Sequence, residues 1–152
     1  MAPLTYLRVI LAGIVLAAFA ASVQAENRTV DINQACDSEP ALMIERITLT
    51  GDRMVLHMRY TQRAGRPTRI GIHPPGDDMA FYITDDRYQQ RHFLLEKDGI
   101  ATLPKHDELK AGEQRRFTLT FERLATRRFH LYEGKLPNSE MVRWNCTNID
   151  LP

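Results

Sequence analysis

Side chains that could do chemistry are few in this sequence, and their spacing is irregular. The histidines are His57, His73, His92, His106 and His130. None of them forms the HxH or HExxH spacing that brings two imidazoles onto one metal ion. His57, His92 and His130 each lie beside an apolar position of an alternating segment, so strand geometry turns them outward. We therefore expect solvated surface histidines, and we predict no metal site.

Nucleophiles are also scarce. After residue 25 the serines are Ser38 and Ser139, both in turn-like segments without the strand–turn–helix context of a nucleophile elbow. Neither Cys36 nor Cys146 has a neighbouring histidine that could activate a thiolate. The sequence predicts no catalytic residue.

Two acid pairs, Asp77–Asp78 and Asp85–Asp86, offer oxygen ligands in or near turns. They lack the regular ligand spacing of a calcium loop, and aspartates are common in turns for local reasons. No glycine-rich phosphate loop is present. We predict no cofactor and no cofactor-binding residue.

Arginine is the side chain that clusters. Two groups lie in connections between expected strands, and they comprise Arg63, Arg66 and Arg69 in the first and Arg123, Arg127 and Arg128 in the second. Loops on a rigid scaffold often carry recognition, so both groups are candidates for capturing an anionic peptide, glycan or envelope component. The alternative is that they serve solubility and pair with nearby acids.

The overall charge argues against nucleic acid as the partner. Arg8 is the only charged residue before Glu26, so 19 Lys and Arg face 19 Asp and Glu in residues 26–152. A balanced chain has no general electrostatic attraction to a polyanion.

The first 25 residues are typical of a signal peptide. Arg8 precedes an apolar run over residues 9–21, and Val23-Gln24-Ala25 places small residues before a cleavage point. The run is shorter than the about 20 residues of a membrane span. We expect residues 1–25 to be a signal peptide and residues 26–152 to be one domain, periplasmic or secreted, with no stable membrane span after cleavage. The alternative is that residues 1–25 are not cleaved and serve as an N-terminal membrane anchor.

The two cysteines fit this compartment. An exported chain with two cysteines has one possible intramolecular disulfide, and we predict that Cys36 and Cys146 form it. Two free or intermolecular thiols are the alternative.

Period-2 alternation predicts strands along most of the domain. The clearest hairpin joins residues 44–50 to 53–61 through Gly51-Asp52, which suits a two-residue type II′ turn. Residues 87–96 are expected to return from the strand at 79–84 with Phe93 and Leu95 facing inward. Residues 101–112 are expected to form a loop or a short helical turn.

Three alternating segments follow at residues 117–121, 129–131 and 142–146. Ile149 and Leu151 are out of phase with Trp144 and Cys146, which predicts a bulge near Thr147. No helix of ordinary length is indicated, and seven to eight short strands describe a sandwich or a small barrel.

The end of the chain carries a family-like pattern. It reads F-x-L-x-F at residues 117–121, F-x-L-x-E-G at residues 129–134, then Trp144 and I-x-L up to Leu151. This pattern resembles the end of small immunoglobulin-like sandwich domains in exported bacterial proteins of unknown function. Glu133-Gly134 is its most distinctive part, whereas His130 stands where those domains commonly have Asp. The resemblance implies a fold and a compartment, and no catalytic residue.

Together these observations predict an all-β protein, a single immunoglobulin-like antiparallel β-sandwich of seven to eight strands after the signal peptide. The expected function is a non-enzymatic binding or interaction module whose partner is an envelope protein, a peptide or a glycan. The alternative is a small envelope hydrolase or metal-dependent enzyme that uses surface His and Asp residues. A third possibility is an accessory or inhibitor subunit of a secreted enzyme.

Overall fold

A computed structural model describes residues 27–63, 65–87, 89–135 and 143–152. The predicted signal peptide, Ser139 and the beginning of the predicted strand at residues 142–146 lie outside these ranges. Within them the chain is all-β, with eleven strands in three antiparallel sheets instead of seven or eight in two. No helix capable of crossing a membrane occurs among the described residues.

The largest sheet has five strands. Their order is β1 (Arg28–Ala35), β2 (Leu42–Thr50), β3 (Arg53–Thr61), β9 (Gln114–Glu122) and β7 (Glu96–Asp98). The predicted hairpin is confirmed, because Thr50 pairs with Arg53 and Leu49 with Met54. At its turn Gly51 has φ 54°, the positive value that a type II′ turn needs at this position.

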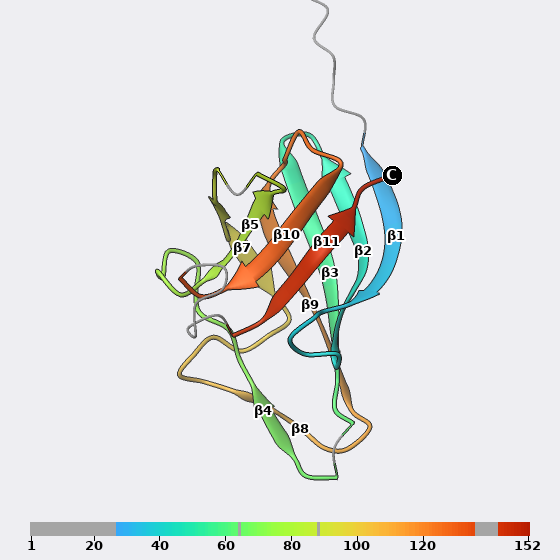
Figure 1. Cartoon of the computed structure of the whole chain (residues 1–152). Coiled ribbons are helices and arrows are strands. Elements are labelled where there is room, and N and C mark those ends of the chain that lie inside the picture. Colours follow the sequence, from blue (N-terminus) through green and yellow to red (C-terminus); the bar gives the residue numbers. More distant parts are fainter. Residues whose placement is uncertain (1–26, 64, 88, 136–142) are drawn as a thin grey trace, which may run out of the picture.

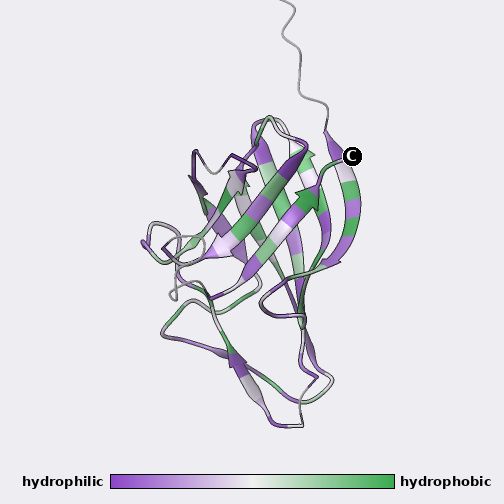
Figure 2. Ribbon diagram, in the orientation of Figure 1, coloured by the Kyte–Doolittle hydropathy of each residue, from purple (hydrophilic) through white to green (hydrophobic). Residues whose placement is uncertain are grey.

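The second sheet has four strands and lies in front of the first in Figure 1. Its order is β11 (Asn145–Asp150), β10 (Arg128–Glu133), β5 (Phe81–Asp85) and β6 (His92–Phe93). The inner faces of the two sheets share one apolar core. Ile47, Leu56 and Leu119 enter it from the first sheet, and Ile83 and Leu131 from the second; all five are fully buried. Figure 2 shows the underlying alternation as hydrophobic and hydrophilic bands along the strands.

The third sheet is a small pair, β4 (Thr68–Ile70) with β8 (Asp107–Leu109). It projects from one end of the two larger sheets (Figure 1). β8 lies in the segment 101–112, for which we predicted a loop or a helical turn. Three residues are too few for alternation to reveal a strand.

The prediction for residues 87–96 is wrong in phase. Phe93 is 44% exposed and Leu95 is 41% exposed, whereas Leu94 between them is buried. The cause is a change of sheet within this segment. The N–H of Leu94 donates to the Phe81 carbonyl of the four-stranded sheet, and the N–H of Leu95 donates to the Thr120 carbonyl of the five-stranded sheet.

The predicted disulfide and the predicted bulge are both present. Cys36 follows β1 and is bonded to Cys146 in β11, so the disulfide joins the edges of the two large sheets. Phe129 pairs with Ile149 and Leu131 with Cys146, so the one residue between them in β10, His130, faces two residues of β11, Thr147 and Asn148. Asn148 there has φ 53°, a left-handed conformation that Asn tolerates better than most residues.

Candidate functional site

The segments that follow β3 and β9 carry the two predicted arginine clusters, and they lie at opposite ends of the large sheets (Figure 1). Arg63 follows the end of β3 that pairs with Gln114, and Arg123 follows the end of β9 that pairs with Arg53. β9 has nine residues, and a strand of that length extends about 30 Å. The six arginines therefore do not form one patch, and their role in ligand binding stays a prediction.

Among the described residues, Arg69 and Arg128 pair with surface acids. Arg69 lies 2.8 Å from Glu108, and both side chains are exposed. Arg128 makes a bidentate contact with Asp150, with Nε–Oδ1 2.7 Å and Nη2–Oδ2 3.2 Å. The hydrogen bond and charge of Asp150 raise the pKa of Arg128, and Arg128 lowers the pKa of Asp150. These two arginines match the alternative interpretation, in which the cluster serves surface pairing.

Arg123 borders a hollow at the end of the molecule, which we call the end hollow. It has a volume of about 330 Å³. Its lining residues are Asp85, Gln90, His92, Arg123, Leu124, Ala125 and Thr126. They come from the end of β5, the approach to β6 and the β9–β10 connection. The volume falls within the range of small-ligand pockets, about 300–1,000 Å³.

Hydrogen bonds hold the β9–β10 side of the end hollow. The Arg123 backbone N–H donates to the Asp52 carbonyl at 2.7 Å, and its Nη1 donates to the Gly51 carbonyl at 3.3 Å. Thr126 Oγ1 donates to the Arg128 carbonyl at 2.9 Å and accepts from the Arg128 N–H at 3.3 Å. The connection is thus ordered by its own contacts, which lowers the entropy lost when a ligand binds.

The β5–β6 side of the end hollow carries an acid and an imidazole. Asp85 Oδ1 accepts the N–H of Arg87 at 3.0 Å and so fixes the turn after β5. His92 Nδ1 lies 3.1 Å from Glu122 Oε2, and the His92 side chain is only 16% exposed. We predicted a solvated His92 on the outer side of its strand. The reversed phase of this segment instead turns it toward β9.

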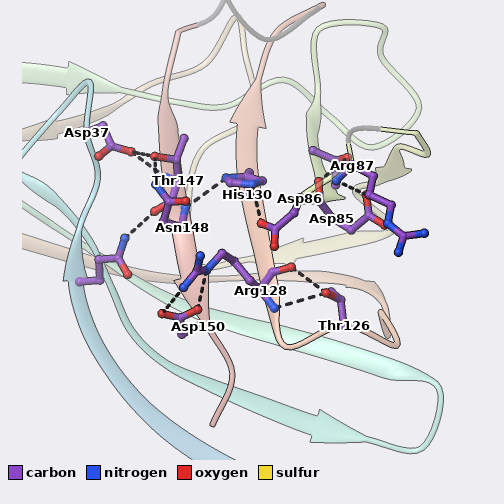
Figure 3. Close-up of polar contacts among 12 residues, drawn as sticks. Asp37, Asp85, Asp86, Arg87, Thr126, Arg128, His130, Thr147, Asn148 and Asp150 are labelled. Carbon is purple, nitrogen blue, oxygen red and sulfur yellow. Dashed lines mark hydrogen bonds and ion pairs between the residues drawn. The ribbon is translucent and has the colours of Figure 1, made fainter.

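His130 forms a second polar network nearby, on the outer face of the four-stranded sheet (Figure 3). The N–H of Asn148 donates to His130 Nδ1 at 3.1 Å, so Nε2 carries the hydrogen and donates to Asp86 Oδ1 at 3.1 Å. His130 points away from the core as predicted, but it is 4% exposed instead of solvated. Both ring nitrogens are engaged, so His130 has no lone pair available to act as a general base.

The same network orders the bulge of β11. Asp37 Oδ2 accepts both the Thr147 N–H, at 2.6 Å, and the Thr147 hydroxyl, at 2.8 Å (Figure 3). Gln34 Nε2 donates to the Thr147 carbonyl at 2.7 Å. Thr147 and Asn148 are thereby held from both sides, and the bulge serves to present one backbone N–H to His130.

Glu133 is a charged residue whose burial the sequence did not reveal. Its side chain is completely buried, in phase with the core residues Phe129 and Leu131. Oε1 accepts the His73 N–H at 3.2 Å, whereas Oε2 lies 4.0 Å from Arg143 Nε and has no hydrogen-bond partner among the described residues. Burial raises the pKa of Glu133 to about 7, and the charge of Arg143 and the His73 N–H offset this only in part.

Within the described ranges, no three His, Cys, Asp or Glu side chains gather closely enough to hold a metal ion. The fold and the Cys36–Cys146 bond define an all-β antiparallel domain suited to an oxidising, extracytoplasmic compartment. No protein-family model, curated protein or solved structure matches the chain.

Proposed function

We propose that this chain is an exported, non-enzymatic binding module of the cell envelope or extracellular space. In this proposal the end hollow receives part of a peptide, a glycan or an envelope protein. The observation that carries the proposal is the convergence of Asp85, His92 and Arg123 from two separate connections on one ordered hollow. Side chains of both charge signs beside small apolar groups suit a polar ligand with donors and acceptors.

We also propose that the fold is immunoglobulin-like. Two antiparallel sheets share one core, and β5, β6, β9 and β10 bring their connections together at one end. Recognition by loops clustered at one end is the common arrangement in such sandwiches. The C-terminal F-x-L-x-E-G pattern supports the same assignment.

A small hydrolase is the second candidate, and one observation favours it. The contact of His92 with Glu122, next to Asp85, is the kind of pair that orients a general base. The described lining of the end hollow contains no serine and no cysteine, and its Thr126 hydroxyl and Asp85 carboxylate already hold the local backbone through hydrogen bonds. Both thiols are in the disulfide, and Ser38 Oγ accepts a hydrogen bond from Asn145 beside that disulfide. We therefore favour binding over hydrolysis.

An NMR titration of the ¹⁵N-labelled chain with soluble peptidoglycan fragments tests this proposal, because these fragments carry sugar and peptide together. We expect saturable shifts of the amides of Asp85, His92 and residues 123–126, and weaker binding by at least about tenfold in Arg123→Gln. Arg63→Gln, at the opposite end of the molecule, is the matched control. An absence of shifts at the end hollow, or binding that Arg123→Gln leaves unchanged, contradicts the proposal. Cleavage of the fragments supports the hydrolase.

A further inference from the structure

A second hollow lies on the other side of residues 90–93, and we call it the outer hollow. It has a volume of about 340 Å³ and is lined by Asp78, Arg91, Phe93 and Lys135. Alternate residues of this segment serve the two hollows: Gln90 and His92 line the end hollow, whereas Arg91 and Phe93 line the outer hollow. Phe93 pairs with Tyr82 across the strands. Tyr82 alternates with the core residues Phe81 and Ile83, so the outer hollow lies over the outer face of the four-stranded sheet.

Arg91 is held in place before any ligand arrives. Its guanidinium carbon lies 5.4 Å from the centre of the Tyr82 ring and 5.5 Å from that of the Phe93 ring. Its Nη1 donates to the Lys135 carbonyl at 2.6 Å. Tyr82 is itself buried and stacked on Tyr132 at 5.6 Å, so the floor under the guanidinium is rigid. Holding a long side chain in one conformation removes much of the entropy that binding would otherwise cost.

The charges of the outer hollow leave one cation unneutralised. Lys135 Nζ lies 3.2 Å from Asp78 Oδ2, and its hydrogen bond and charge lower the pKa of Asp78. No carboxylate of the described residues lies within ion-pair distance of Arg91. A guanidinium with one donor fixed has further donors arranged as a fork, which matches the two oxygens of a carboxylate.

We propose that the outer hollow binds an acidic sugar, a uronic acid residue of a polysaccharide, through a carboxylate–Arg91 pair. The sugar ring rests against the exposed Phe93 ring and buries apolar surface there. Asp78 accepts a hydrogen bond from a sugar hydroxyl. An acidic peptide fits less well, because an Asp or Glu side chain has no ring to rest against Phe93 and no hydroxyl to donate to Asp78. This site is independent of the end hollow and of the function proposed for it.

Calorimetric and NMR titrations of the full chain with trigalacturonic acid test this proposal. The methyl-esterified trimer is the matched ligand, because it keeps the sugar and removes the charge. We expect the acid to bind at least about tenfold more tightly than the ester, since a charge-assisted pair is lost. Arg91→Gln should remove this preference, and Arg87→Gln, on the same connection but outside the lining, should keep it.

The native protein supplies a readout that does not depend on the folding of a variant. Trigalacturonic acid should shift the ring protons of Phe93 and Tyr82 and leave the amides of residues 123–126 unchanged. Equal binding of acid and ester, retention of the preference in a folded Arg91→Gln protein, or shifts confined to the end hollow would overturn the proposal. Tighter binding of a glutamate-rich peptide than of the sugar would also overturn it.

Discussion

Glu133 makes the stability of this domain depend on pH in an unusual direction. A buried carboxyl with a folded-state pKa of about 7, against an ordinary 4.5, binds its proton more tightly in the folded state than in the unfolded state. The free energy of unfolding therefore carries no penalty from Glu133 below pH 4.5. The penalty grows as the pH rises from 4.5 to 7 and reaches about 3 kcal/mol above that range, from about 1.4 kcal/mol per pKa unit.

Glu133→Gln removes this penalty, because the amide has a similar shape and carries no charge. We expect the variant to unfold with a free energy about 2–3 kcal/mol higher than the wild type at pH 8.5, and within about 1 kcal/mol of it at pH 4.5. Gln keeps an oxygen that can accept the His73 N–H, the bond that Oε1 now accepts. Urea unfolding of both proteins at the two pH values, with the disulfide intact, measures the difference.

Glu96→Gln is the matched control, because Glu96 is an exposed carboxylate on the edge strand β7. Its stability relative to the wild type should be the same at pH 4.5 and pH 8.5. The reasoning fails if Glu133→Gln is less stable than the wild type at pH 8.5. That result would mean that the Arg143 charge, 4.0 Å from Glu133 Oε2, outweighs the cost of burial.

Two further predictions concern the frame of the molecule. Reduction of Cys36–Cys146, which are 110 residues apart, should lower the free energy of unfolding by about 4–5 kcal/mol in the chain-entropy model. A thermal melt that reduction leaves unchanged would contradict a stabilising role. Gly99→Ala should lower the free energy of unfolding more than Gly112→Ala does, although the φ values of the two glycines are nearly equal, 80° and 82°. A Cβ at Gly99 would lie 2.8 Å from the Arg116 carbonyl oxygen, whereas a Cβ at Gly112 meets nothing within 4 Å. We expect Gly112→Ala to lower the free energy of unfolding by about 1 kcal/mol, from backbone strain alone. Gly99→Ala should lower it by at least about 2 kcal/mol more, because of the close contact. Equal losses in chemical denaturation would show that the close contact relaxes.

The long paired strands were predictable because each has one buried face. Met54, Leu56, Met58 and Tyr60 occupy every second position of β3, and Phe117, Leu119 and Phe121 do so in β9, so the buried face of each strand follows from the sequence. The bulge was predictable for the same reason, since Ile149 breaks the phase that Cys146 sets. The disulfide followed from cysteine number and compartment.

Burial on the outer face was not predictable, because alternation reports only which side of a sheet a residue occupies. Tyr82, His130 and Tyr132 point away from the core and are nevertheless buried by their neighbours on that face. Glu133 is a different case. Its position in the alternation pointed toward the core, but nothing in a single sequence indicates that a carboxylate at such a position is fully enclosed. The phase of residues 92–95 was not predictable either, because the segment passes from one sheet to the other and only the tertiary structure determines where it does so.

The position of the disulfide also has a mechanical consequence. Tension applied between Arg28 and Leu151 can peel β1 away from β2 and strip the last residues of β11 from β10. It then meets the covalent bond between Cys36 and Cys146, and the load passes through the two sulfur atoms. Residues 37–145, which lie between the two cysteines and include both hollows, are outside the path of this load. An oxidised chain can therefore bear tension without unfolding around the two hollows, whereas in a reduced chain the same tension would unfold the segments that line them.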